Sequence, residues 1–420
     1  MRAPPTSEAK QTARHSVSLA WVPRDAWLIM AARGLRSFSL GACSIVLAEY
    51  LTLLGMSLAQ VGLFLSAGMA GSALAMLGVV LLGDRFGRRR ILVALSALMA
   101  AAAGVLVLTN HPVLLLAIAF FGSLNLGGGG GGPIEPMEQS SLAGASTSNR
   151  RTDLYAIYGL IAMGASALGA LAGGLPSLYQ RLGLAQLDSY RVVILTLSLF
   201  AFGGAVLYAF LSRQVESSEN GSRWTNPLKL RARRTIFTLA ALFSVDHLAG
   251  TFVVQSLAAH WFITKFGMSL EVVGLIFFWS NILAAGSLWV SSQLSKKIGL
   301  INTMVFTHIP ANLLLLSVPF LPNGWLAGTA WVLRGFLSMM DVPTRQSYTM
   351  AVVPPDERSA MAGLTSLPRS AVGAVGPWIA GTVAGLGLVS LPFIACGVLK
   401  IGYDLTLFGL FRKVRPPEET

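Results

Sequence analysis

The sequence is poor in charge, and in acidic charge above all. Of its 420 residues only 12% are charged, with 18 Asp and Glu against 31 Lys and Arg, while 54% are hydrophobic. Soluble domains carry about 25% charged residues, so this composition excludes a water-soluble protein. The two cysteines, Cys43 and Cys396, lie inside apolar runs without ligand spacing. The sequence therefore predicts neither a disulfide framework nor a metal site.

Motifs of catalysis and nucleotide binding are missing as well. Residues 127–132 are six glycines before Pro133, but no Gly-Lys-Ser/Thr follows, so this is not a phosphate-binding loop. No nucleophile elbow occurs, and we predict that the protein is not an enzyme and has no cofactor. Each glycine weakens a helix by about 1 kcal/mol. The run therefore predicts a hinge or room for substrate, or alternatively a short linker.

Long apolar runs are what the sequence has instead. About 20 apolar residues in an α-helix cross the ~30 Å hydrocarbon core of a bilayer. We predict an all-α integral membrane protein with 12 transmembrane helices. The predicted spans are residues 27–53, 58–82, 89–109, 112–134, 154–175, 191–212, 235–263, 268–292, 300–321, 325–346, 358–386 and 389–412.

The basic residues indicate how these spans are oriented. With both termini and every second loop placed inside, 23 of the 31 Lys and Arg fall in inner segments and 3 in outer loops. Basic loops stay cytoplasmic, which predicts cytoplasmic termini in a multi-pass protein of the bacterial inner membrane. The net charge of +13 could also indicate nucleic-acid binding. We predict no nucleic-acid partner, because the basic residues occupy short loops and not one continuous face.

The two halves of the chain repeat one another. The sequence Gly-Met-Ser-Leu at residues 55–58 recurs at 267–270, an offset of 212. Pro-x-Glu-Gln-Ser at 136–140 recurs as Pro-x-Arg-Gln-Ser at 343–347, an offset of 207. Constant offsets through several motifs predict two pseudo-symmetric six-helix bundles. The predicted division is a tail at 1–26, bundles at 27–212 and 235–412, a linker at 213–234 and a tail at 413–420.

The loop between the second and third spans carries a recognisable motif. Gly-Asp-Arg-Phe-Gly-Arg-Arg-Arg at residues 83–90 resembles the loop 2–3 signature of the major facilitator superfamily (MFS). The resemblance implies alternating access between two repeated bundles. It also implies that Asp84 reaches the cytoplasmic start of helix 11, at residues 354–359, when the inside is closed. A carboxylate at a helix N-terminus is stabilised by about 0.3–1 kcal/mol. The predicted gating residues of this loop are Asp84, Arg85, Gly87 and Arg88.

Helices 5 and 11 each carry a glycine-rich motif. These are Gly-Ala-Leu-Ala-Gly-Gly at residues 169–174 and Gly-Pro-Trp-Ile-Ala-Gly at 376–381. Both are similar to a signature of the drug–proton antiporters in the superfamily, which implies export. Small residues let helix backbones approach, which predicts close packing where the halves meet. Ordinary small-residue packing without a link to export is the alternative. The packing residues are Gly169, Gly173, Gly174, Gly376 and Pro377.

Ionisable side chains inside the spans cost about 2.5–3.5 kcal/mol each on insertion scales, so they mark functional positions. The resemblance implies that helices 1, 4, 7 and 10 line the central cavity, and these four helices hold most of the charge within spans. The predicted substrate-cavity residues are Arg33, Arg36, Arg334 and Asp341. Glu138 and Arg345, near the inner ends of helices 4 and 10, join the predicted gating residues.

Asp246 is the predicted proton-coupling residue, together with His247. At about 1.5 Å rise per residue, Asp246 lies near the middle of helix 7. Burial disfavours a charged carboxylate and a nearby arginine favours it, so such a residue can exchange its proton as the cavity opens. Arg33 or Arg36 is the expected partner, because helices 1 and 7 are repeat mates. A static salt bridge between the halves, and a structural role for His247, are the alternatives.

Four further charges lie within or near the ends of spans. Lys400 and Asp404, four residues apart on helix 12, are expected to neutralise each other. Arg369 in helix 11 and Glu49 near the outer end of helix 1 carry no predicted role.

These features predict a monomeric secondary transporter whose partners are the lipid bilayer, protons and a small-molecule substrate. The leading function is proton-coupled export of a small organic solute or drug. Uptake or facilitated transport of a small anionic metabolite is the first alternative, favoured by Arg33, Arg36 and Arg334 in one cavity. A transporter-like membrane sensor is an alternative of another class.

Overall fold

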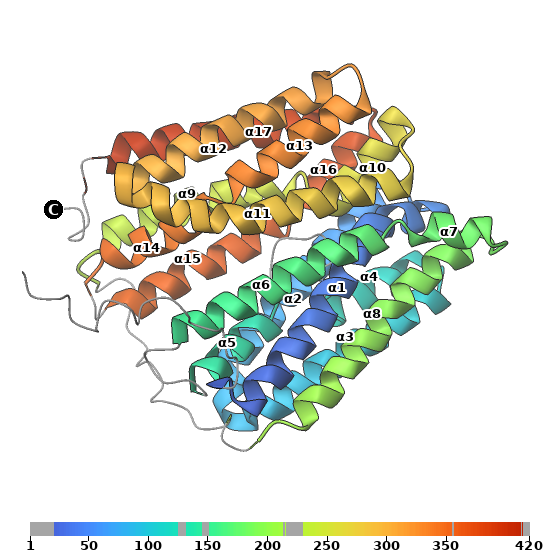
Figure 1. The fold of residues 1–420 in the computed structure, drawn as a ribbon, viewed down its shortest axis with the longest axis horizontal. Helices are drawn as coiled ribbons and strands as arrows, with labels where there is room; N and C mark the ends of the chain where they lie inside the picture. Colours follow the sequence, from blue (N-terminus) through green and yellow to red (C-terminus); the bar gives the residue numbers. More distant parts are fainter. Residues whose placement is uncertain are drawn as a thin grey trace, which may run out of the picture.

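The computed structural model describes residues 21–124, 132–144, 151–212, 215, 230–354, 357–412 and 414, without the side chains at 80–85, 151–152, 358–360, 362–363 and 367. The described residues form helices and no strand. The ribbon divides into two groups of helices, blue to green for the first half of the chain and yellow to red for the second (Figure 1). The predicted all-α fold is confirmed.

The helices follow the predicted spans. The first half contains α1 (Arg24–Leu53), α2 (Leu58–Phe86), α3 (Arg88–Leu108), α4 (Pro112–Phe121), α5 (Ile134–Gly144), α6 (Arg151–Ala172), α7 (Leu175–Arg181) and α8 (Gln186–Ala209). The second contains α9 (Arg233–Thr251), α10 (Gln255–Phe266), α11 (Leu270–Ile298), α12 (Leu300–Ser317), the 3₁₀ turn η6 (Val318–Phe320), α13 (Gly324–Ser338), α14 (Asp341–Ala351), α15 (Arg358–Gly373), α16 (Gly376–Gly385) and α17 (Leu391–Phe411). Among the described residues, 8 helical segments are long and apolar enough to cross a membrane.

The repeat recurs in the ends of the helices. Both ends of α2 and α11 are 212 positions apart, and both ends of α5 and α14 are 207 apart. The turns into α3 and α12 are also equivalent, with Gly87 at φ 85° and Gly299 at φ 86°. A side chain with a Cβ is strained at such positive φ, so both turns need glycine. The two halves therefore share these helix boundaries and the same glycine turn at equivalent positions.

Five of the predicted spans are broken into two helices. They are helix 4 (α4 and α5), helix 5 (α6 and α7), helix 7 (α9 and α10), helix 10 (α13 and α14) and helix 11 (α15 and α16). The predicted ends at residues 134 and 346 are therefore too early, because α5 continues to Gly144 and α14 to Ala351. The predicted glycine-rich break in helix 4 falls between α4 and α5, and residues 127–131 lie outside the described residues.

Proline accounts for the break in helix 11. Pro377 follows the break between α15 and α16, and a proline lacks the amide hydrogen that continues a helix and disfavours helical conformation before it. The break between α9 and α10 contains Phe252, Val253 and Val254 and no such residue. The sequence therefore signals the break in helix 11 and not the one in helix 7.

Three clusters of buried apolar side chains hold the helices together. The largest contains residues from both halves, such as Leu47 and Phe64 of the first and Phe262 and Phe393 of the second. The other two each belong to one half and lie toward the opposite end of the bundle. The halves thus share a core at the predicted outer end and have separate cores at the predicted inner end.

Backbone contacts between the halves also lie at the predicted outer end. A Cβ on Gly62 would lie 2.2 Å from the Pro377 carbonyl oxygen, and one on Gly381 would lie 2.3 Å from that of Leu58. Ser66 Oγ accepts a hydrogen bond from the Trp378 amide at 2.9 Å. Helices α2 and α16 therefore pack backbone to backbone. The ends of α7, α10 and α16 gather at this end of the molecule, on the right of Figure 1.

Candidate functional site

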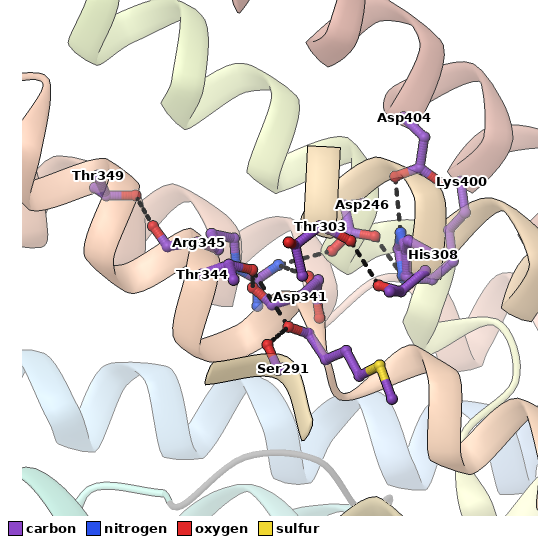
Figure 2. A network of polar contacts seen from close by, with 12 residues as sticks. Asp246, Ser291, Thr303, His308, Asp341, Thr344, Arg345, Thr349, Lys400 and Asp404 are labelled. Atoms are coloured by element: carbon purple, nitrogen blue, oxygen red, sulfur yellow. Dashed lines mark hydrogen bonds and ion pairs between the residues drawn. The ribbon is translucent and has the colours of Figure 1, made fainter. Parts of the chain in front are cut away.

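A cluster of buried charges surrounds Asp246 in the second half (Figure 2). Asp246 lies on α9 and is 6% exposed. Its Oδ1 accepts a hydrogen bond from Lys400 Nζ of α17 at 2.5 Å, and its Oδ2 accepts one from Arg345 Nη1 of α14 at 3.2 Å. Arg345 Nη1 also lies 3.2 Å from an Asp341 carboxylate oxygen, four residues earlier on α14. One carboxylate thus joins three helices.

A second buried carboxylate, Asp404, lies beside this group. His308 Nδ1 of α12 is 2.8 Å from Asp404 Oδ1, and Asn312 Nδ2 donates to Asp404 Oδ2 at 3.0 Å. The predicted Lys400–Asp404 pair is therefore wrong, because Lys400 binds Asp246. We call the following residues the C-half cluster: Asp246, His308, Asn312, Asp341, Arg345, Lys400 and Asp404.

The first half contains a comparable cluster around Glu138, which lies on α5 and is 0% exposed. Arg36 Nη2 of α1 is 2.5 Å from Glu138 Oε2, and Arg36 Nη1 is 3.2 Å from Oε1. Tyr158 and Tyr208 donate their hydroxyls to the same carboxylate at 2.7 and 2.5 Å. Arg33 pairs with Glu135 at 3.1 Å. We call these residues the N-half cluster: Arg33, Arg36, Glu135, Glu138, Tyr158 and Tyr208.

Two arginines in the interior of the second half have no carboxylate partner among the described residues. They are Arg334 on α13 and Arg369 on α15, and the Nε of each is buried without a hydrogen-bond partner there. Arg334 instead lies over the Trp331 ring, 4.8 Å from its centroid. The charges of both arginines act on Asp246. Sequence reasoning gave Arg369 no role, although its charge inside an apolar span was a signal.

Sequence comparison identifies the family. The profile of the Major Facilitator Superfamily matches residues 29–377. The chain belongs to this superfamily. As a member of this superfamily it is a multi-pass membrane transporter that moves a small molecule, and it is not an enzyme.

Relatives and solved structures agree with this assignment. The uncharacterized membrane protein YJR124C of Saccharomyces cerevisiae is 26% identical over 421 residues, which cover 92% of this chain and 94% of that protein. A bacterial homolog of the human lysosomal transporter Spinster, inward-facing and unoccupied, has a TM-score of 0.73 at 15% identity, covering 95% of this chain and 99% of its own. The nucleoside transporter NupG has a TM-score of 0.73 at 12% identity, covering 93% and 100%. These two likenesses show the MFS fold.

The structure corrects one predicted contact of this MFS transporter. Asp246 does not pair with Arg33 or Arg36, which belong to the N-half cluster. The reason is that α1 lies mainly against α6 and α8 of its own half and meets helix 7 at α10, whereas α9, which carries Asp246, lies against α15 and α17. Repeat mates share a position in their bundles, but this does not bring their side chains together. The predicted contact between helices 1 and 7 at Asp246 is wrong.

The predicted gating residues lie in different places. Glu138 and Arg345 belong to separate clusters, so they do not pair with each other. Arg88 Nη1 donates to the Ser140 carbonyl oxygen at 3.5 Å, which joins the loop 2–3 motif to α5. The side chains of Asp84 and Arg85 lie outside the described residues. The gating roles stay predictions.

The motif glycines pack mainly inside their own halves. Added Cβ atoms at Gly169 and Gly173 would meet α1, and one at Gly376 would meet α9. Gly174 touches the other half, since its Cβ would lie 2.8 Å from Glu271 Cα. Their predicted location where the halves meet therefore holds for Gly174 and for Pro377, whose carbonyl oxygen faces α2, and is wrong for the other three.

Proposed function

We propose that this MFS transporter couples the movement of a small organic solute to protons, with Asp246 as the proton-binding residue and export as the direction. The supporting observation is the buried Asp246 carboxylate held between Lys400 and Arg345. An ion without a partner is costly in a low-dielectric interior, so the carboxylate and its cations need one another. Protonation of Asp246 removes that mutual attraction.

The loss of this attraction changes contacts among three helices at once. Asp246 belongs to α9, Arg345 to α14 and Lys400 to α17. Arg345 retains Asp341, whereas Lys400 needs water or another anion in place of Asp246. The charged and protonated forms of Asp246 therefore favour different packings of the second half. Such a difference is what links proton binding to a movement between two states.

Alternating access also requires halves that move as units. Each cluster keeps its buried charges within one half, while the shared core and the α2–α16 contact join the halves at the predicted outer end. We infer that this state, closed at the predicted outer end, alternates with one in which these outer contacts open and the inner ends close, with both termini cytoplasmic in an inner membrane. The proposed gate comprises Asp84, Arg85, Gly87, Arg88, Glu138 and Arg345, and the proposed cavity includes Arg33, Arg36, Arg334 and Asp341.

Proteoliposomes that contain the pH dye pyranine test the proton assignment. Organic acids, organic cations and neutral compounds are added one at a time. The pyranine fluorescence reports the proton movement that each compound causes. Asp246→Asn is expected to abolish solute-driven proton movement while solute exchange across the membrane continues. Asp188→Asn is the matched control, because Asp188 is exposed and pairs with Arg191 of the same helix at 3.0 Å. Proton movement that persists in Asp246→Asn rejects the assignment.

Inside-out vesicles test the direction. Export predicts ATP-independent solute accumulation driven by an acidic vesicle interior. Accumulation in right-side-out vesicles with an acidic exterior contradicts export and supports uptake. Uptake of a small anionic metabolite is the second candidate, and the unpaired Arg334 and Arg369 favour it.

A further inference from the structure

The buried charges of the two halves are balanced differently. In the N-half cluster two arginines face two glutamates, and their charges cancel. Around Asp246 the second half holds four cations, Arg334, Arg345, Arg369 and Lys400, against three carboxylates, Asp246, Asp341 and Asp404. Glu357, a further buried carboxylate of this half, instead accepts hydrogen bonds from the backbone amides of Arg231 and Ala232. A positive charge is therefore in excess among the described residues around Asp246. An uncompensated positive charge inside a bundle calls for an anion.

The excess charge is carried by Arg334 and Arg369. Arg345 and Lys400 are both engaged by Asp246. Arg334 has the face of Trp331 under its guanidinium, which leaves the edge of the guanidinium, with its N–H donors, for a ligand. Its charge acts on Asp246 of α9 and Cys396 of α17, so it lies on the side of α13 that faces these helices.

Arg369 lies on the side of α15 that packs against α9. Gly373, one helical turn after Arg369, lies so close to His247 that an added Cβ would be 2.5 Å from the imidazole Cδ2. The charge of Arg369 is attracted by the Asp246 carboxylate and repelled by the Arg345 guanidinium. Arg345 has carboxylate partners, whereas Arg369 has none among the described residues and is repelled by Arg345, so its charge is held there at an energetic cost.

We propose that Arg334 and Arg369 bind the carboxylate or phosphate group of the transported solute, and that the substrate is a small organic anion. A guanidinium donates two parallel hydrogen bonds to either group, so both chemistries fit. This inference rests on the proposed transport function, but not on its proton coupling or its direction. The N-half arginines, which are already neutralised by Glu135 and Glu138, are excluded from this role.

Thermal unfolding of the purified full-length protein tests the proposal at one fixed pH and without any gradient. The probes are benzoate, succinate and glycerol 3-phosphate, compared with neutral glycerol, the cation tetraphenylphosphonium and sodium chloride at matched ionic strength. A bound ligand raises the melting temperature by mass action. At least one organic anion is expected to stabilise the wild-type protein. Stabilisation by glycerol 3-phosphate alone or by the carboxylates alone decides between the two chemistries.

The variants are Arg334→Gln and Arg369→Gln, with Arg191→Gln as the matched control. Each of the first two is expected to raise the apparent Kd for the anion at least tenfold, while Arg191→Gln binds as the wild type does. Without ligand, Arg334→Gln is expected to melt no lower than the wild type, because it removes an unpaired buried charge. A purely structural arginine would lower that melting temperature.

Some results would overturn the proposal. One is stabilisation by the cation or by glycerol and by no organic anion. Another is anion binding that is unchanged in both Arg334→Gln and Arg369→Gln. Loss of proton coupling in Asp246→Asn is measured separately in proteoliposomes, so the substrate class and the proposed coupling fail independently.

Discussion

Glu138 and Arg345 occupy equivalent positions of the two repeats and carry opposite charges. They lie on α5 and α14, whose ends are 207 positions apart. Each binds an opposite charge from the first helix of its own half: Glu138 binds Arg36 of α1, and Arg345 binds Asp246 of α9. The duplicated bundle has therefore kept the site of the pair and inverted its polarity. This inversion places the acidic member on a different helix in each half.

Removing one member of the Arg36–Glu138 pair is expected to lower the free energy of unfolding more than replacing both members with apolar residues. Glu138→Gln leaves Arg36 buried without its carboxylate, and we expect a loss of about 3–5 kcal/mol in the free energy of unfolding. The double variant Arg36→Leu with Glu138→Leu removes both ions and should be more stable than Glu138→Gln alone. Thermal unfolding in detergent measures both. A Glu138→Gln protein as stable as the wild type contradicts the observed pairing.

The pairing of Asp246 with Lys400 is testable by a double-mutant cycle. Asp246→Asn leaves Lys400 without a buried partner. Lys400→Met removes one of the two cations that bind Asp246, and Arg345 remains as the other. The two changes together should therefore cost less than the sum of the two alone, by about 0.5–3 kcal/mol. The melting temperatures of the four proteins supply the cycle. Additive effects would exclude direct contact between these side chains.

Gly62 is expected to be required for closure at the predicted outer end. Gly62→Ala places a methyl group 2.2 Å from the Pro377 carbonyl oxygen, so α2 and α16 must separate. We expect a loss of about 1–3 kcal/mol in stability together with slower transport. Gly78→Ala on the same helix is the control, because nothing lies within 4 Å of its added Cβ. It should equal or exceed the wild type in melting temperature, since alanine favours a helix.

Glu49 is expected to help hold the two halves together. Its Oε1 lies 2.5 Å from His260 Nδ1, so the pair joins α1 of the first half to α10 of the second. Glu49→Gln weakens this contact and should increase the population that is open at the predicted outer end. Spin labels at Leu182→Cys and Leu386→Cys, which are 71% and 76% exposed, report the separation of the halves.

The label distance is expected to lengthen in Glu49→Gln and to stay unchanged in Asp188→Asn, whose partner lies in the same half. The native thiols Cys43 and Cys396 are buried and are replaced by alanine in every sample. An unchanged distance distribution in Glu49→Gln shows that this pair does not control the outer contact.

The sequence by itself determined the membrane fold, the repeat and the approximate positions of the helical spans, but not most of the breaks within them. Hydropathy, loop charge and repeated motifs are properties of short segments, so they can be read from the sequence without knowing how the helices pack. The positions of the costly buried charges were also available, because any ion in an apolar run is visible as such. Glu138, Asp246 and Arg334 were identified in this way.

Only the tertiary structure decided which charges meet. Lys400 was expected to pair with Asp404 four residues away, and it binds Asp246, which is 154 residues away in sequence. Helical periodicity gives the spacing of side chains along one helix, but not the rotation of that helix against its neighbours. Partner choice depends on that rotation and on which helices share a half. The same reason explains why the unpaired state of Arg369 is a property of the folded bundle and not of its local sequence.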